Sequence, residues 1–426
     1  MGELIQPVKG MNDVLPAQAA HWRRLESVAY ALFARYGYER VRLPVLERTE
    51  LFSRSIGELT DIVSKEMFTF DDHGESLTLR PEATAGVVRA GLSNGLLHNQ
   101  QQKLWCAGPM FRREKPQKGR YRQFHQMSVE ALGFAEPEID AELIALSARL
   151  WRELGLASVR LELNTIGTAE SRKAYKQVLV DYFSQYRSLL DEDSLRRLER
   201  NPLRILDSKN PALRELIDAA PLMSAHLDDE SRAHFDRVQA LLGDVGVPFT
   251  LNPRLVRGLD YYARTVFEWL TDRLGAQSAI CSGGRYDGLV AQLGGRDTPA
   301  VGWALGSERI VELMQAEGVA AGDAPPDAHL VAAGEAERRF GFSLAEQLRD
   351  RLPGLKLAIG APGAGFKAQL RRADKSGARF ALIVGEAELA ARKVSVKPLR
   401  EEQPQRLLTV EECIDLLGQT PSVGIE

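Results

Sequence analysis

Residues 103–133 contain two alternating stretches joined by a short basic loop. The first reads KLWCAGPMFRRE, the second reads RYRQFHQMSVEALG, and Lys115 to Gly119 lie between them. Two extended runs separated by a short glycine-containing loop are typical of an antiparallel hairpin. Side chains alternate along a strand, so Phe124, Gln126 and Glu130 are expected on one face unless a bulge intervenes. A hairpin this long predicts antiparallel pairing in this part of the chain.

Basic residues are concentrated in two segments although the net charge is only −3. Residues 103–125 hold seven Lys/Arg and one acid, and residues 367–406 hold ten Lys/Arg and five acids. Local positive patches matter more for phosphate binding than the charge of the whole chain. The alternative for each segment is an ordinary solvated surface.

Several classes of protein are excluded by what the sequence lacks. No apolar run approaches the roughly 18 residues of a membrane span, and the first residues have no signal-peptide pattern. Cys106, Cys281 and Cys413 form neither a disulfide framework nor a zinc pattern, which favours a cytoplasmic protein. No histidine has a partner at metal-ligand spacing, so no structural metal is expected. GAPGAGFK (360–367) is one residue too long for a phosphate loop, and Ala368 replaces the Ser/Thr that loop requires.

The order of periodic segments predicts a large first domain, an insertion within it and a second, smaller domain. Helices are expected at 16–36 and 138–154, and strands at 38–47 and 158–164. Residues 168–245 are rich in Leu, Asp, Glu and Arg, which favours a small helical insertion. A Pro-rich linker, EGVAAGDAPPDA, then precedes alternating strands and helices that predict a compact α/β domain with a mostly parallel sheet.

The stretch RGLDYYARTVFEW (257–269) places unusual residues beside a strand pattern. Arg257, Asp260, Tyr261 and Tyr262 surround Gly258, and the alternating half begins only at Arg264. Arginine forks suit phosphate and carboxylate oxygens. Together with Arg112 and Arg120 of the hairpin, these residue types favour binding of anions over covalent catalysis; the alternative is a packed tyrosine pair with a surface ion pair.

The sequence resembles histidyl-tRNA synthetases of the bacterial type, within the class II aminoacyl-tRNA synthetases. The resemblance covers nearly the whole chain through GMNDVLP, LRPEATA, FRRE, GRYRQFHQMSVEALG, LVRGLDYYARTVFEW, AVGWALGSERI and FKAQLRRADKSGARFALIVGE. Two positions depart from the usual pattern. Ala83 stands where glycine is more frequent, and Arg113 stands where an aromatic residue or histidine is common. Neither position carries an expected role.

The resemblance implies a histidine–tRNA ligase. Such an enzyme uses ATP, with Mg²⁺ on its phosphates, to activate L-histidine and transfers it to the 3′ end of tRNA(His). Arg257 and Arg112 would be catalytic. ATP would be bound by Arg112, Glu114, Arg120, Phe124 and Arg309. Histidine would be bound by Glu82, Thr84, Gln126, Glu130, Arg257, Tyr261 and Tyr262. The tRNA would be contacted by Lys367, Arg371, Arg372 and Lys375. Asp260 is expected to orient Arg257 or a backbone amide.

The same resemblance implies the fold. Residues 1–325 would form an α+β catalytic domain on a mixed, mainly antiparallel sheet, with the helical insertion at 168–245. Residues 326–426 would form an α/β anticodon-binding domain. The segment 16–47 resembles a homodimer interface, so a cytoplasmic homodimer is expected.

Two other functions belong to related proteins. One is a regulatory subunit of the ATP phosphoribosyltransferase of histidine biosynthesis, which generally lacks the C-terminal domain and part of the catalytic set. Residues 327–426, Arg112, Arg257 and Arg309 are all present here. The other is a prolyl- or threonyl-tRNA synthetase, whose pocket does not need the imidazole-binding residues expected in RGLDYY.

Overall fold

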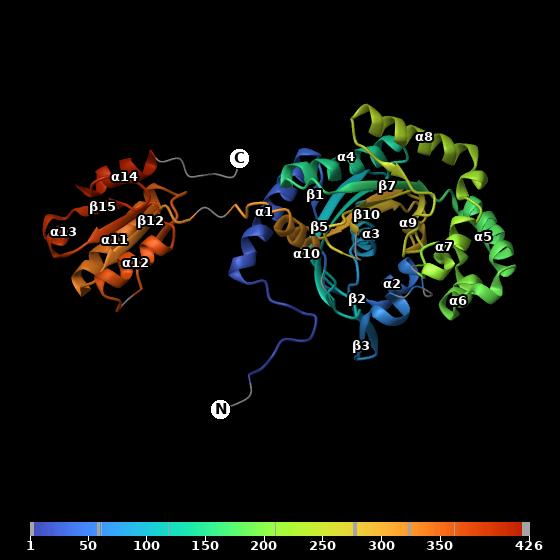
Figure 1. The fold of residues 1–426 in the computed structure, drawn as a ribbon, viewed down its shortest axis with the longest axis horizontal. Helices are drawn as coiled ribbons and strands as arrows, with labels where there is room; N and C mark the ends of the chain where they lie inside the picture. The colour runs from blue at the N-terminus through green and yellow to red at the C-terminus, as the bar shows by residue number, and fades with distance from the viewer. Residues whose placement is uncertain are drawn as a thin grey trace. The chain divides into compact units, whose positions relative to one another are not determined.

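The structure is a computed structural model that describes residues 4–57, 60, 62–117, 119–208, 210–275, 279–322, 325–361 and 363–419. The chain forms two compact units, Met1–Ala321 and Gly322–Glu426, and each is described by itself (Figure 1). An eight-stranded sheet with the order β1-β5-β6-β11-β10-β9-β7-β8 is the centre of the first unit. Its strands are β1 (Glu39–Arg40), β5 (Gln102–Phe111), β6 (Gln123–Leu132), β7 (Arg160–Thr165), β8 (Thr250–Leu251), β9 (Ala263–Leu270), β10 (Ala279–Arg285) and β11 (Ala300–Gly306).

The sheet is mixed and mainly antiparallel, as expected from the sequence. Among the strand pairs described in this sheet, only the two outer ones, β1–β5 and β7–β8, are parallel. The β5–β6 hairpin keeps one continuous register from Gln102↔Leu132 to Phe111↔Gln123, so no bulge interrupts it. The alternation read from the sequence is therefore confirmed for this hairpin.

Helices cover one face of the sheet and leave the other face to a cavity. Three helices pack on the first face: α1 (Pro16–Arg35), α4 (Pro137–Leu154) and α10 (Ser307–Ala316). Met127, Val129 and Ala131 of β6 point into this core. The intervening residues Gln126 and Glu130 face the opposite side, where two more helices, α3 (Thr84–Ser93) and α9 (Leu289–Gln292), pack around the sheet.

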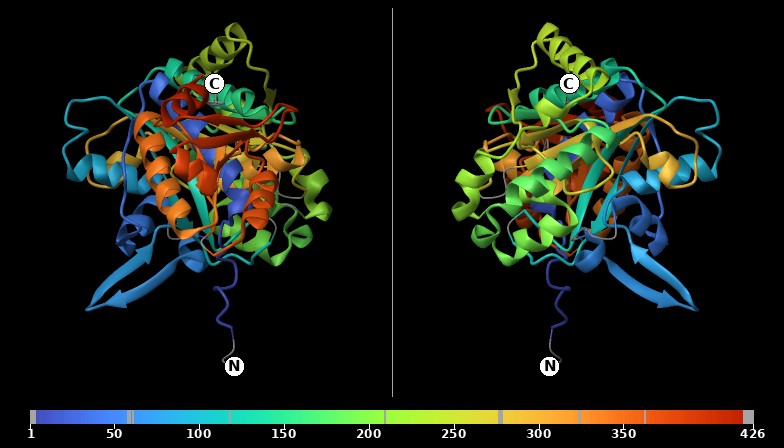
Figure 2. Two further views of the ribbon diagram at one scale, coloured as in Figure 1. Left: turned by 90° about the vertical axis from the view of Figure 1, so that its left-hand side faces the viewer. Right: turned by 90° about the vertical axis from the view of Figure 1, so that its right-hand side faces the viewer.

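The strand expected at 38–47 is broken into two short strands that belong to different sheets. β1 joins the large sheet, whereas β2 (Leu46–Arg48) joins a three-stranded sheet with β3 (Phe68–Asp72) and β4 (Glu75–Leu79). Pro44 lies between them and has no backbone N–H to donate, which ends the ladder at this point. The β3–β4 ribbon projects from the first unit (Figure 2). The helix α2 (Thr49–Ile56) and a π-helical turn η1 (Ile62–Glu66) complete this region.

The region 168–245 is helical, as the sequence predicts, and has its own core of Tyr175, Leu179, Phe183, Leu203 and Ile205. Side-chain oxygens of Thr168, Asp191 and Asp228 accept backbone N–H bonds at helix starts and so fix where these helices begin. Its elements are α5 (Ala169–Ser184), η2 (Arg187–Leu189), α6 (Glu192–Arg200), η3 (Pro202–Ile205), η4 (Pro211–Leu213), α7 (Arg214–Asp218), η5 (Met223–His226) and α8 (Asp229–Asp244).

The second unit is an α/β domain around a five-stranded sheet of order β13-β12-β14-β15-β16. The predicted mostly parallel sheet has two parallel and two antiparallel pairs, because β15 runs opposite to both of its neighbours, β14 and β16. The strands are β12 (Ala328–Ala332), β13 (Leu357–Ile359), β14 (Phe380–Val384), β15 (Val394–Pro398) and β16 (Arg406–Leu408). The helices are α11 (Glu335–Arg351), α12 (Phe366–Lys375), α13 (Glu386–Ala391) and α14 (Val410–Gly418).

Candidate active site

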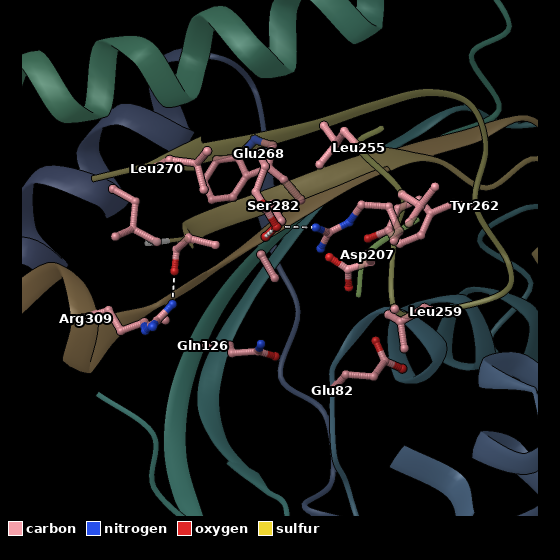
Figure 3. A pocket seen from close by; sticks show the side chains of 18 of the residues that line it. Glu82, Gln126, Asp207, Leu255, Leu259, Tyr262, Glu268, Leu270, Ser282 and Arg309 are labelled. Carbon is pink, nitrogen blue, oxygen red and sulfur yellow. Dashed lines mark hydrogen bonds and ion pairs between the residues drawn. The ribbon is translucent and has the colours of Figure 1, made fainter. Parts of the chain in front are cut away.

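A cavity of about 690 Å³ lies on the sheet face that α1, α4 and α10 leave uncovered. It brings together residues that are far apart in sequence, from the hairpin, β9, α10 and the loop before β9 (Figure 3). The predicted catalytic, ATP-binding and histidine-binding residues that line it are Glu82, Thr84, Arg112, Glu114, Arg120, Phe124, Gln126, Arg257, Tyr261, Tyr262 and Arg309. Glu130 lies buried behind this lining.

One end of the cavity is basic and contains an aromatic ring. The Arg112 guanidinium lies 5.2 Å from the centre of the Phe124 ring, and its Nε donates to the carbonyl of Pro81 at 2.9 Å. Arg120 forms an ion pair with Glu114 at 2.9 Å. Arg309 donates to the carbonyls of Gly119, at 3.3 Å, and of Ala279, the first residue of β10. Backbone and carboxylate contacts thus hold three arginines in fixed directions, an arrangement that suits a polyphosphate beside a flat base.

The Arg309 guanidinium is largely buried and lies near a second cation, Arg120. Burial lowers the pKa of Arg309, and the positive charge of Arg120 lowers it further. Two cations held close together gain free energy when an anion binds between them. This end of the cavity therefore favours a ligand with several negative charges.

Arg257 occupies the middle of the cavity wall. Its Nη1 donates to Glu268 at 2.5 Å, and its guanidinium lies 5.6 Å from the centre of the Tyr262 ring. Burial disfavours the charge, but Glu268 outweighs burial and raises the pKa of Arg257 above its usual value. Its Nε is buried and, among the described residues, has no hydrogen-bond partner. Arg257 is therefore permanently charged and keeps a donor for a ligand.

The other end of the cavity presents oxygen acceptors. The Glu82 carboxylate accepts the backbone N–H groups of Thr84 (2.6 Å) and Ala85 (2.9 Å), which fixes it at the start of α3. Burial raises the pKa of Glu82 despite these bonds. The side-chain oxygen of Gln126 is buried and has no partner within the described part of the chain. An unpaired buried acceptor costs free energy until a donor reaches it, so this end suits an ammonium group.

Glu130 lies at the floor of this end with two hydroxyl donors. Thr84 Oγ1 donates to one carboxylate oxygen at 2.7 Å, and Tyr286 donates to the other at 2.5 Å. Burial raises the pKa of Glu130 to about 8. Gly302 faces Glu130 across the β6–β11 ladder, and a Cβ there would overlap the Glu130 carboxylate. Glycine at 302 is therefore required for Glu130 to lie where it does.

The raised pKa of Glu130 gives a testable dependence of stability on pH. The unfolded chain loses this proton near pH 4.5, whereas native Glu130 keeps it up to about pH 8, so stability falls as pH rises between them. Glu130→Gln does not titrate. In urea unfolding without histidine, wild-type stability should therefore fall relative to Glu130→Gln between pH 5 and 8, by on the order of a few kcal/mol. A constant difference across this range would contradict the prediction.

Two residues of the site, Tyr286 and Glu268, were not among those predicted from the sequence. Tyr286 follows β10 and reaches Glu130 of β6 only because a single strand, β11, separates β10 from β6 in the sheet. The sequence feature that could have indicated Tyr286 is GGRY, which follows a strand pattern. Glu268 was recognisable as the one acid within the apolar strand of 264–269, since a carboxylate there must be paired or face a polar cavity.

Asp260 lies differently from expectation. Its Oδ1 accepts a hydrogen bond from Asn201 Nδ2 at 2.9 Å, which is a contact with the helical insertion. The partner that holds the Arg257 guanidinium is Glu268. The sequence left the role of Asp260 open between orienting Arg257 and orienting a backbone amide, and the structure places its carboxylate against Asn201, which follows α6.

The predicted tRNA-contacting residues belong to the second unit. Lys367, Arg371, Arg372 and Lys375 are exposed on α12, whereas Gln369 and Ala373 of the same helix are buried. No group of His, Cys, Asp or Glu suited to a metal ion occurs in the described ranges. Within the same ranges, no helix has the length and apolar character needed to cross a membrane.

An antiparallel sheet that presents arginines from a hairpin and from a strand–helix unit to one cavity defines a class II aminoacyl-tRNA synthetase. The family model described as "Histidyl-tRNA synthetase" matches residues 10–310, and one described as "Anticodon binding domain" matches residues 330–420. The chain therefore belongs to the histidyl-tRNA synthetase family.

Known proteins are similar to this chain over almost its whole length. The chain is 56% identical over 414 residues to "Histidine--tRNA ligase" of Halorhodospira halophila, covering 97% of each chain. It is 54% identical over 420 residues to the protein of that name from Nitrosomonas europaea, covering 98% of this chain and 100% of the relative. Among solved structures, the apo histidyl-tRNA synthetase of S. aureus is similar with a TM-score of 0.82 at 33% identity, covering 97% and 100% of the two chains.

Proposed function

We propose that this chain is a histidine–tRNA ligase that consumes ATP. The observation that carries the proposal is one cavity with three parts: a basic end with an aromatic ring, an acceptor end above Glu130, and Arg257 between them. ATP and histidine fit these ends because one ligand is a polyanion with a flat base and the other carries an ammonium group and an imidazole.

In the first step, a histidine carboxylate oxygen attacks the α-phosphorus of ATP. The bond from the α-phosphorus to the bridging oxygen breaks, and pyrophosphate leaves with that electron pair. Such a transfer depends on positioning and on neutralising charge. Arg112 would contact the α-phosphate, and Arg120 and Arg309 would contact the outer phosphates, where Mg²⁺ accompanies ATP. Phe124 and Arg309 would enclose the adenine.

Arg257 would contact the histidine carboxylate and the α-phosphate together. The substrate ammonium would donate to Glu82, Thr84 and Gln126, whose buried oxygen lacks a partner among the described residues. The neutral imidazole has one donor and one acceptor nitrogen. Glu130 would accept from the first, and a hydroxyl of Tyr261 or Tyr262 would donate to the second. In the second step, the terminal adenosine hydroxyl of tRNA attacks the adenylate carbonyl and AMP leaves.

ATP–pyrophosphate exchange measured with each of the twenty amino acids tests this function. Exchange should depend on histidine alone. Exchange driven by proline or threonine would instead assign another synthetase of the subclass. No exchange with any amino acid, from folded protein, would favour the regulatory-subunit function.

The second unit would bind the anticodon stem and loop of tRNA(His). Replacing Lys367, Arg371, Arg372 and Lys375 with alanine should weaken tRNA binding. It should also reduce the salt dependence of the binding constant by roughly one unit of slope per lost phosphate contact. Histidine-dependent exchange should be unchanged. Filter binding over a salt series measures this effect.

A matched control for α12 replaces Arg392, Lys397 and Arg406, which are exposed basic residues elsewhere in the same unit. Equal weakening by the control would show that the overall charge of the unit, and not α12, sets the affinity.

A homodimer is also part of the proposal. Val45 and Leu46 are partly exposed apolar residues within the segment 16–47, and β1 of the same segment is an outer strand of the large sheet. Light scattering on the purified protein should give twice the mass of one chain, and a monomer at micromolar concentration would contradict it.

A further inference from the structure

The segment that carries Arg257 has no regular secondary structure of its own. It runs between β8 and β9 and is held partly by backbone bonds, such as that from Asp260 N–H to the Ile56 carbonyl at 3.4 Å, and partly by side-chain contacts. The helical insertion supplies two of them. Arg254 donates to the carbonyls of Asp218 and Pro221, both at 3.0 Å, and Asp260 accepts from Asn201 at 2.9 Å. The catalytic segment is therefore tied to the insertion on both sides of Arg257.

Asn201 is well placed to act as an anchor. Its backbone N–H donates to the carbonyl of Arg197 at 2.7 Å, and its own carbonyl accepts from Arg204 at 3.0 Å. Pro202 follows and restricts the chain further. These contacts hold the Asn201 amide where α6 ends and η3 begins, so the Asp260 carboxylate meets a fixed donor.

Two cations of α5 act on the same carboxylate. Arg172 and Lys176 are one turn apart on this helix. Burial lowers the pKa of both cations, and the charge of Asp260 partly offsets this effect in each. With Asp260 and Asn201 they line a small cleft of about 80 Å³. The insertion thus offers Asp260 a hydrogen bond and a positive field.

The small cleft and the active-site cavity share a wall. Val256, Arg257 and Leu259 line both of them. Since the wall is one segment thick, a shift of its outer side towards or away from the insertion moves the backbone of Arg257 on its inner side. Glu268 fixes the guanidinium end of Arg257, but it does not hold this backbone.

We propose that Asp260 is a positioning residue for Arg257, and that its contact with Asn201 makes the helical insertion set the place of the Arg257 backbone in the active site. This inference rests on the proposed function, because it needs Arg257 to act in adenylate formation. It gives the insertion a role in the first step of the reaction that does not require Asn201 to touch the substrate.

An exchange of the two partners tests the proposal. Asn201→Asp places two carboxylates opposite each other, whereas the double variant Asn201→Asp with Asp260→Asn restores an amide–carboxylate pair in reverse. Asn210→Asp is a matched control, because Asn210 Nδ2 donates to Asp191 at 2.7 Å inside the insertion. Single-turnover adenylate formation at saturating histidine and ATP, the ATP KM, and transfer from adenylate made beforehand are measured for each full-length variant.

Asn201→Asp should slow adenylate formation about tenfold, the low end of what a hydrogen bond to a charged group contributes. The ATP KM and the transfer step should change little, and the double variant should recover most of the rate. An unchanged rate in Asn201→Asp, no recovery in the double variant, or an equal loss in Asn210→Asp would each overturn the inference. Wild-type protein that forms no histidyl-adenylate would instead refute the proposed function, which separates the two failures.

Discussion

Arg257→Ala should lower the rate of adenylate formation by on the order of 10²–10³, the loss seen when one well-placed donor is removed from such a site. In the proposed mechanism the guanidinium would face charge that grows on the α-phosphate as pyrophosphate departs, and only interactions that strengthen in the transition state raise kcat. The ATP KM should change less, because Arg112, Arg120 and Arg309 are the residues proposed to hold the nucleotide. Transfer to tRNA from adenylate made beforehand should also change less, because no pyrophosphate leaves in that step.

Two controls separate chemistry from packing in this prediction. Arg257→Lys keeps the charge but loses the fork, so it should recover only part of the rate. Arg257→Ala also leaves the Glu268 carboxylate without its ion pair, at a half-buried position. The double variant Arg257→Ala with Glu268→Gln removes that charge. If the double variant regains wild-type adenylate formation, unpaired Glu268 explains the loss and Arg257 is not catalytic.

Glu130→Gln should raise the histidine KM by on the order of 10²-fold, because the histidine-bound site would need Glu130 ionised to accept from the imidazole N–H, and glutamine cannot supply that charged acceptor. The ATP KM should change little. Glutamine keeps the volume and can still bond to Thr84 and Tyr286, whereas Glu130→Ala would also leave those two buried hydroxyls without a partner. The alanine variant should therefore show a larger increase in histidine KM and a lower stability.

If Glu130 makes this contact, we expect the site to need no editing domain. A pocket that bonds both imidazole nitrogens rejects apolar analogues by roughly 10⁴–10⁵, because its own polar groups would remain unpaired. Competition between histidine and such analogues in the exchange reaction measures this ratio. If Glu130→Gln raises the histidine KM and the ATP KM together, Glu130 supports the fold and does not recognise histidine.

The sequence was most informative where one local rule decided the structure. Alternation in the hairpin placed Gln126 and Glu130 on one face because no bulge interrupts β5 and β6. The break between β1 and β2 was harder to see, since it depends on Pro44 and on two sheets that compete for one segment. The antiparallel return of β15 and β16 depends on pairing choices between strands, which hydrophobic periodicity does not encode.

Contacts between distant segments could not be read from the sequence. Tyr286 meets Glu130 across 156 positions of the chain, and Asn201 meets Asp260 across 59. Neither pair has a local pattern, because each depends on how the sheet orders its strands or on how the insertion folds back. The individual residue types were visible in the sequence, but their partners required the tertiary structure.

Gly302 sets a limit on how amino-acid specificity can change during evolution. Since a Cβ at this position would overlap the Glu130 carboxylate, the acid on β6, which we propose binds the imidazole, and the glycine on β11 can only be replaced in a particular order. A side chain at 302 that appears first displaces the acid and abolishes the old activity before a new one exists. Loss of Glu130 that appears first leaves a vacant, permissive pocket. Any route from this pocket to another substrate should therefore pass through a change on β6 before one on β11.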